Sequence, residues 1–122
     1  MVGKLVFACL LVYAFAFQGK PSFDKGYETV AAEEGALLQI TCSAKGTPPI
    51  THTWFDKDDL VVSEMPFNRI FSVARPNETL IVFKNTTRQD SGEYTCSASN
   101  IHGMVSKVYQ LFIIPKLGTD QL

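Results

Sequence analysis

The chain has 122 residues, of which 46% are hydrophobic and 19% are charged, and its formal net charge is −1. This length fits one globular domain, and this composition is that of a folded chain rather than a disordered one. Because the charge is balanced and no basic stripe is present, the sequence argues against nucleic acid as a partner.

The N-terminus has the pattern of a secretory signal peptide. Lys4 precedes an apolar run over residues 5–17, which is shorter than the ~20 residues that a helix needs to cross a bilayer. Small side chains at Ala14 and Ala16 favour cleavage between residues 16 and 20. We therefore expect residues 1–18 to be removed and the rest to be secreted, with no membrane span. The alternatives are a buried core helix or an uncleaved anchor.

The cysteine count agrees with secretion. Cys9 lies within the leader, so Cys42 and Cys96 remain as an even pair. In an oxidising compartment such a pair predicts a disulfide, and the alternative is two unpaired buried thiols. Closing the loop between them would contribute about 4 kcal/mol in the chain-entropy model.

After residue 20, short alternating segments are separated by turn residues, which is the pattern of an all-β sandwich or barrel. Alternation predicts strands around residues 38–42, 80–83, 94–98 and 109–113. The side chains expected to point inward are Leu38, Ile40, Cys42, Leu80, Val82, Tyr94, Cys96, Ala98, Tyr109, Leu111 and Ile113. Residues 59–71 read as long and irregular, with Pro66 interrupting strand pairing.

Several motifs together resemble one known family. Trp54 follows Cys42 by 12 residues, and the sequence DSGEYT over residues 90–95 comes directly before Cys96. With the first strand over residues 21–23, the turn EEG over residues 33–35 and the pattern A-x-N-x-x-G over residues 98–103, these motifs resemble the immunoglobulin fold. The closest likeness is to its intermediate set (the I-set) of adhesion molecules, receptor ectodomains and muscle proteins. The resemblance covers residues 21–115 and leaves residues 116–122 as a polar tail.

The resemblance implies an immunoglobulin-like two-sheet Greek-key sandwich. In that fold Cys42 and Cys96 would link the sheets across Trp54, and Tyr94 would form the tyrosine corner. Asp90 and Gly92 belong to the same signature. Asp90 would pair with an arginine at the lower edge, with Arg69 as the first choice and Arg88 as the reserve. Thr86 stands where related domains usually place an apolar residue, and we expect it to loosen that end of the sandwich.

Catalytic, metal and cofactor sites are not expected. Ser91 lies in the signature turn, and no His–Asp pair accompanies it at a usable spacing. The sequence DKDD over residues 56–59 is similar to a calcium loop, but Val61 and Phe67 stand where that loop needs Gly and Glu. We interpret it as a solvated turn.

Two N-glycosylation acceptor sequences are present, at Asn77 (NET) and at Asn85 (NTT). In the immunoglobulin fold both asparagines fall in surface turns. We expect both to carry glycans in a secreted chain.

Alternation also predicts which apolar side chains face solvent. On the sheet expected to contain Trp54 and residues 94–98 and 109–113, these are Phe55, Val108 and Phe112, with Met104 at the hairpin. On the other sheet they are Ile81 and Phe83. Clustered apolar side chains on one sheet face often mark a protein contact. In a longer protein they would instead pack against a neighbouring domain.

The sequence therefore predicts a secreted immunoglobulin-like module for protein recognition in cell adhesion or receptor–ligand signalling. Its partner would be another immunoglobulin-like or cell-surface protein, or a second copy of the chain. The alternative is a truncated or spliced fragment of a multidomain receptor that acts as a structural or decoy piece.

Overall fold

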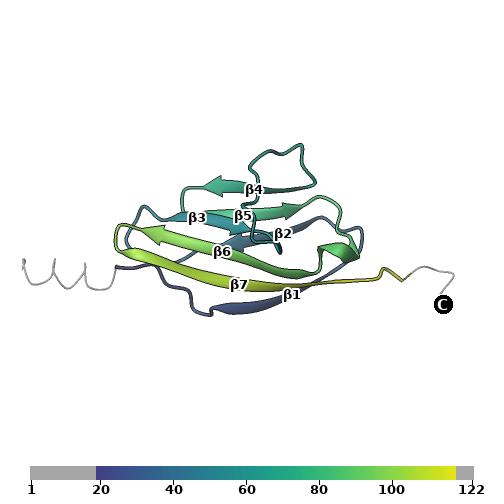
Figure 1. Ribbon diagram of the computed structural model, residues 1–122, viewed down its shortest axis with the longest axis horizontal. Coiled ribbons are helices and arrows are strands. Elements are labelled where there is room, and N and C mark those ends of the chain that lie inside the picture. The colour runs from purple at the N-terminus through teal and green to yellow at the C-terminus, as the bar shows by residue number, and fades with distance from the viewer. Residues whose placement is uncertain (1–18, 118–122) are drawn as a thin grey trace, which may run out of the picture.

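Seven β-strands form two facing sheets in the computed structural model, which describes residues 19–117 (Figure 1). The strands are β1 (Tyr27–Glu33), β2 (Leu38–Cys42), β3 (Thr51–Phe55), β4 (Ile70–Arg75), β5 (Glu78–Phe83), β6 (Gly92–Asn100) and β7 (Gly103–Ile114), with one 3-10 turn, η1 (Arg88–Asp90). The predicted two-sheet sandwich is confirmed. The predicted signal peptide, residues 1–18, lies outside the described residues, as do residues 118–122.

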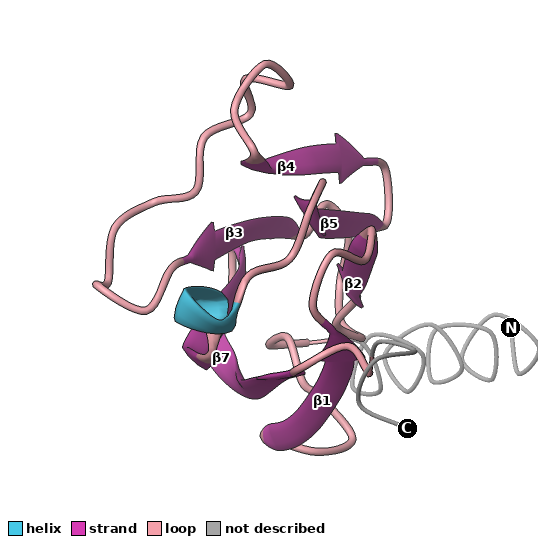
Figure 2. Ribbon diagram, turned by 90° about the vertical axis from the view of Figure 1, so that its right-hand side faces the viewer, coloured by secondary structure: helices cyan, strands magenta, loops and turns pink. Residues whose placement is uncertain are grey.

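One sheet has four strands in the order β1-β7-β6-β3, and the other has three in the order β2-β5-β4. Figure 2 shows them as two layers. All pairs are antiparallel except β1 and β7, which run parallel from the pair Tyr27–Val108 to the pair Glu33–Ile114. The first strand expected at residues 21–23 is reduced to a single bridge between Ser22 and Lys45.

The core lies between the sheets and follows the predicted alternation in three strands. In β2, β6 and β7 the residues expected to point inward are in the core or pack against it, except that Ala98 is buried outside the main cluster. The central members of this core are Trp54, Tyr94, Leu111 and the two cysteines, all 1% exposed or less.

The facing of β5 is opposite to the prediction. Ile81 and Phe83 are fully buried members of the core, because their pairing partners Ile40 and Leu38 also face it. Leu80 and Val82, expected to point inward, lie on the outer side of the sheet and are still nearly buried. Ile81 and Phe83 are therefore unavailable as a binding face.

The segment between β3 and β4 is irregular, as predicted. Its one bridge pairs Val61 with Phe55. Further along, the amide of Val62 donates to the carbonyl of Trp54, and the amide of Ser72 donates to the carbonyl of Ser63. This segment therefore connects the free edges of the two sheets.

Candidate functional site

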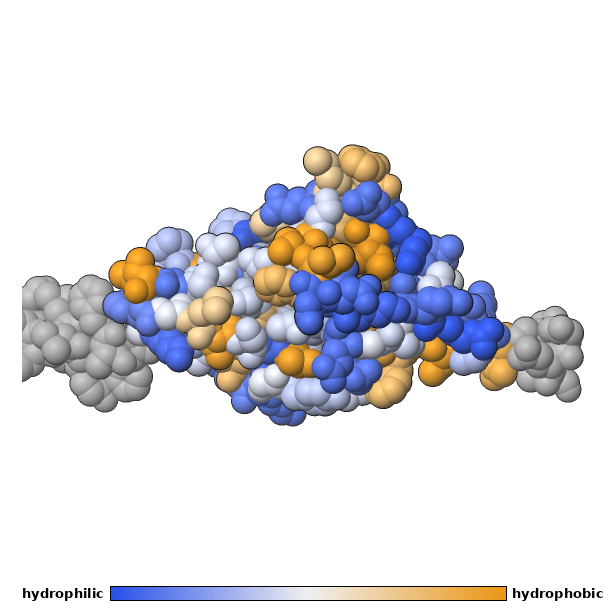
Figure 3. All heavy atoms as spheres, viewed as in Figure 1, coloured by the Kyte–Doolittle hydropathy of each residue, from blue (hydrophilic) through white to orange (hydrophobic). Residues whose placement is uncertain are grey.

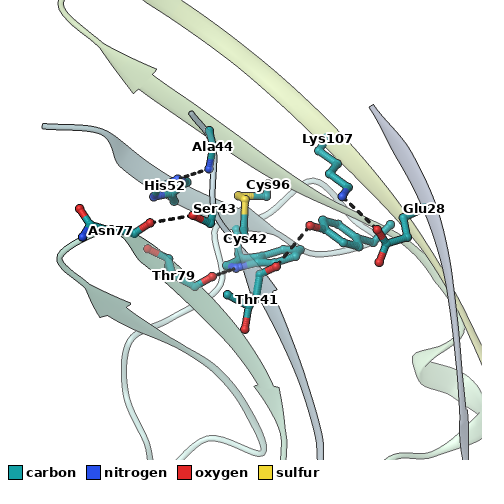
Figure 4. Close-up of a disulfide and its surroundings, with 12 residues drawn as sticks. Glu28, Thr41, Cys42, Ser43, Ala44, His52, Asn77, Thr79, Cys96 and Lys107 are labelled. Carbon is teal, nitrogen blue, oxygen red and sulfur yellow. Dashed lines mark hydrogen bonds and ion pairs between the residues drawn. A yellow bond between two sulfur atoms is a disulfide. The ribbon is translucent and has the colours of Figure 1, made fainter. Parts of the chain in front are cut away.

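The predicted disulfide is present at the centre of the sandwich. The sulfur atoms of Cys42 and Cys96 are 2.04 Å apart, and both residues are fully buried (Figure 4). Trp54 pairs with Cys96 in the strand register, and its indole N–H donates to the carbonyl of Thr79 at 2.9 Å. Its ring lies 5.0 Å from that of Tyr109. The N–H group of the buried indole thus has a hydrogen-bond partner, and the residues around the disulfide have structural roles.

The corner around Asp90 is a closed hydrogen-bond network. The guanidinium of Arg69 donates to both carboxylate oxygens of Asp90, at 2.8 and 2.7 Å, so the first-choice partner is confirmed. The amide of Thr87 also donates to this carboxylate, and the hydroxyl of Tyr94 donates to the carbonyl of Asp90 at 2.6 Å. Burial by itself raises the pKa of Asp90, but the hydrogen bonds from Arg69 and Thr87 outweigh it and hold the pKa below its usual value.

Thr86, which we expected to loosen its end of the sandwich, is buried and hydrogen-bonded there. The residue is 1% exposed. Its hydroxyl accepts from the amide of Ala36 at 3.0 Å and donates to the carbonyl of Glu33 at 2.7 Å. For a buried hydroxyl with both kinds of partner, the hydrogen bonds offset the cost of desolvation. Thr86 therefore ties the loop after β5 to the turn after β1.

Gly92 begins β6 in a conformation that favours glycine. Its φ is 149°, and a Cβ there would lie 3.2 Å from two carbon atoms of the Lys57 side chain. The ammonium of Lys57 donates to the carbonyl of Gln89. The lysine is thereby held against η1.

The outer face of the four-stranded sheet carries a row of four apolar side chains and one threonine. The space-filling view in Figure 3 shows apolar patches interrupted by polar atoms. The strand registers pair Val61 with Phe55, Phe55 with Thr95, Thr95 with Val108, and Val108 with Tyr27. Directly paired residues point to the same side of a sheet. These five residues therefore cross the whole face, and we call them the apolar stripe. Val61 and Tyr27 are 65% and 53% exposed, while the three between them are half-buried.

The structure separates the predicted partner face into a centre and two flanks. Phe55 and Val108 lie in the stripe. Met104 and Phe112 are exposed on the same face of β7, but each is four residues from Val108, or about 13 Å along a strand. Ser106 and Gln110 come between them.

Sequence reasoning missed two members of the stripe, Tyr27 and Val61. Tyr27 joins it only because β1 pairs in parallel with β7. Val61 joins it only through the hairpin that returns after Phe55. Neither pairing leaves a spacing signal in the sequence, although both residues are visible as apolar side chains beside turns.

Both glycosylation acceptors are exposed, at positions away from the stripe. Asn77 lies in the turn between β4 and β5, and Asn85 lies in the loop after β5. They lie at opposite ends of β5, which belongs to the three-stranded sheet. The asparagine side chains thus lie outside the outer face of the four-stranded sheet.

A groove of about 780 Å³ opens between the free edges of β3 and β4. His52 lines it, and the Nε2 of this residue accepts a hydrogen bond from the amide of Ala44 at 3.1 Å. Burial lowers the pKa of His52, which keeps the ring neutral for that bond. Within residues 19–117 no group of three or more His, Cys, Asp or Glu side chains is placed to hold a metal ion. No helix in this part of the chain is long and apolar enough to cross a membrane.

Comparison with known proteins gives a consistent result. The family model "Immunoglobulin I-set domain" matches residues 21–113. Mouse palladin is 33% identical over 99 residues, which is 76% of this chain and 7% of palladin. Human cell adhesion molecule 1 is 38% identical over 81 residues, covering 66% of this chain and 16% of that protein. The chain thus spans a small part of the relatives it matches.

Solved structures show the same architecture. A three-domain I-band fragment of titin, I67–I69, matches with a TM-score of 0.66 and 30% identity over 80% of this chain and 34% of the fragment. The titin tandem A164–A165 matches with a TM-score of 0.69 and 26% identity, covering 81% of this chain and 51% of the tandem.

Proposed function

The chain belongs to the immunoglobulin I-set family, and from that premise we propose that it is a secreted module that binds another protein through the apolar stripe. The observation that carries the proposal is that Val61, Phe55, Thr95, Val108 and Tyr27 adjoin one another across the sheet. Adjoining exposed apolar groups mark protein contacts, whereas scattered ones do not. The similarity to cell adhesion molecule 1 supports a role in adhesion or receptor–ligand contact.

Secretion is supported by two independent features. Residues 1–18 have the charge and apolar pattern of a signal peptide. The buried Cys42–Cys96 disulfide needs an oxidising compartment. Mass spectrometry of the N-terminus of protein collected from culture medium tests this, and we expect the first residue to fall between 17 and 21. Retention of Met1 on a cell-associated product would contradict secretion.

Glycans at Asn77 and Asn85 belong to the same proposal. Sugars at these positions would cover the ends of the three-stranded sheet and leave the stripe open. Digestion of the secreted protein with peptide-N-glycosidase F should remove two glycans, and Asn77→Gln and Asn85→Gln should each remove one. A protein of unchanged mass after digestion would contradict this.

The central test removes the stripe one side chain at a time. Fluorescently labelled protein is titrated onto a panel of intact cells, and binding is measured by flow cytometry. We expect Phe55→Ser to weaken binding about 30-fold, because an anchoring contact residue inside an interface is typically worth about 2 kcal/mol or more. Val61→Ser, at one end of the stripe, should weaken binding less. Ile101→Ser is the matched control, since Ile101 is 84% exposed on the β6–β7 hairpin and lies outside the stripe.

Two outcomes redirect the proposal. If Phe112→Ser weakens binding as much as Val61→Ser does, the contact extends beyond the stripe along β7. If folded Phe55→Ser and Val61→Ser proteins bind like wild type, the stripe is not the binding surface. Melting temperatures of all variants show which of them remain folded.

The rival proposal is that the chain is a piece of a multidomain receptor with a structural or decoy role. It is supported by the small fraction of each relative that the chain matches. In that case the stripe would pack against an adjoining domain. Sequencing of full-length transcripts from the same locus distinguishes the two, because the rival requires further immunoglobulin-like domains in frame.

A further inference from the structure

Acidic residues lie along one side of the apolar stripe near its Val61 end. Asp56, Asp58 and Asp59 form the turn that closes the hairpin between Phe55 and Val61. Asp56 stabilises this turn by accepting from the amides of Asp58 and Leu60 at 2.9 and 3.0 Å. The other two aspartates of the turn, Asp58 and Asp59, are exposed.

A fourth carboxylate joins the turn from the neighbouring strand. Glu93 is exposed, and it lies two residues before Thr95 in β6, so it faces the same side of the sheet. Thr95 is the direct partner of Phe55. Glu93 is therefore diagonal to Phe55 at the edge of the stripe. We call Asp56, Asp58, Asp59 and Glu93 the acidic rim.

The acidic rim is not neutralised within the protein. Among residues 19–117, the ion pairs involve the carboxylates of Asp24, Glu28, Glu34, Glu78 and Asp90, and none involves the rim. The one cation in the turn, Lys57, packs over Gly92 and donates to the carbonyl of Gln89. A chain with a net charge of only −1 thus concentrates negative charge without ion pairs beside the Val61 end of the apolar stripe.

We propose that the stripe binds a protein surface with an apolar centre and a basic rim of Arg or Lys, and that it does not bind a second copy of this chain. This inference rests on the proposed function, because it specifies the partner of the same surface. Complementary charge around an apolar contact speeds association and rejects partners of the wrong charge.

The geometry of the stripe explains why a second copy is rejected. Two copies packed stripe on stripe have a two-fold axis that runs either along the stripe or along the strands. In the first arrangement the acidic rim, which lies on one side of the stripe, is carried to the opposite side in the second copy, where it faces the uncharged side chains of Thr53 and Ser97. In the second, the axis follows β6 and sets Glu93 against Glu93. The second arrangement therefore places like charges together, and the first gives the acidic rim no cation to pair with.

The test uses a random 12-residue peptide library displayed on phage and selected on the immobilised protein. We expect the enriched peptides to combine an aromatic or leucine residue with two or more Arg or Lys. Synthetic peptides from this set should bind at least about tenfold more weakly to the triple variant Asp58→Asn, Asp59→Asn, Glu93→Gln, which keeps shape and removes charge. Binding to wild type should also weaken between 50 and 300 mM NaCl. The control Glu33→Gln alters an exposed carboxylate at the far end of β1 and should bind like wild type.

The outcomes separate this inference from the proposed function. If peptides lose binding to Phe55→Ser but are neutral or acidic, or bind the triple variant like wild type, the basic partner is wrong and the stripe remains a binding surface. If no peptide enriches, or binding survives in folded Phe55→Ser, both are wrong. Analytical ultracentrifugation should find a monomer at high micromolar concentration. A dimer that Phe55→Ser dissociates would identify a second copy as the occupant and overturn the inference.

Discussion

Two loops of this protein carry aspartates, one at the corner before β6 and three in the turn after β3, and the two loops use them in opposite ways. At the corner before β6, the carboxylate of Asp90 is buried and accepts two hydrogen bonds from Arg69 and one from Thr87. The backbone carbonyl of Asp90 accepts another from the hydroxyl of Tyr94. In the turn after β3, Asp58 and Asp59 are exposed and without ion pairs in the described chain. The comparison shows that the residue type does not decide its role. The role of a carboxylate depends on its burial and on the number of hydrogen-bond donors around it. An exposed carboxylate without such donors can contact a protein partner.

The same substitution at the two loops gives the largest contrast. Asp90→Asn should lower the free energy of unfolding by about 2–4 kcal/mol, because it leaves Arg69 without its partner and sets an amide N–H₂ against the guanidinium. The lower half of this range is favoured because the Arg69 side chain is 42% exposed. Asp58→Asn should change stability by less than about 0.5 kcal/mol. Urea titrations of both variants measure this, and equal losses would remove the contrast.

Thr86→Val examines the loop beside the corner. The substitution keeps the shape of the side chain but leaves the amide of Ala36 and the carbonyl of Glu33 without the hydroxyl. We expect a loss of about 1–2 kcal/mol in unfolding free energy. Thr86→Ser retains the hydroxyl and should lose less. If Thr86→Val were as stable as wild type, the hydroxyl bonds would contribute nothing, and an apolar residue would serve equally well here.

Tyr94→Phe removes a single hydrogen bond from the corner around Asp90. The phenol hydroxyl donates to the carbonyl of Asp90 at 2.6 Å, while the ring packs at 5.2 Å against Phe83 in an edge-to-face arrangement. Because the ring contact is kept, we expect a loss of only about 0.5–1.5 kcal/mol. Chemical denaturation checks this value. A loss larger than that of Asp90→Asn would reverse the order of importance within the corner.

The smallest expected effect is the contribution of Asp90 to the change in unfolding free energy between pH 7 and pH 4. The pKa of Asp90 is lowered in the folded protein, so its contribution to stability is complete above the ordinary pKa near 4 and is lost as the pH falls through the lowered folded value. Stability should therefore change little through Asp90 between pH 7 and pH 4 and should fall below pH 4. Asp90→Asn should flatten this acid limb. Thermal melts of wild type and of this variant from pH 7 to pH 2.5 test the prediction.

The sequence predicts the structural roles of residues that have a distinctive spacing or belong to a recognisable motif. Cys42, Trp54, Tyr94 and Cys96 have a spacing that few folds share, and the pairing of Asp90 with Arg69 follows from the resemblance. The facing of β5 could not be predicted, because Leu80, Ile81, Val82 and Phe83 are all apolar and alternation carries no signal there.

The apolar stripe was only half visible for a related reason. Phe55 and Val108 could be assigned to an outer face by counting from buried neighbours. Their alignment with Tyr27 and Val61 depends on strand register, which pairing between distant segments sets. The same register separates Met104 and Phe112 from the centre. A pattern in one segment cannot report which residue of another segment it meets.

The parallel pairing of β1 with β7 has a consequence for biosynthesis. Tyr27 and Val108 are 81 residues apart in the chain, so at ordinary translation rates β1 waits on the order of ten seconds for its partner strand to be made. Until β7 arrives, β6 also lacks one neighbour, and the five side chains of the stripe cannot be aligned. In a nascent or incompletely folded chain the surface proposed to bind a partner is therefore incomplete, and it is assembled only when β7 has joined the sheet.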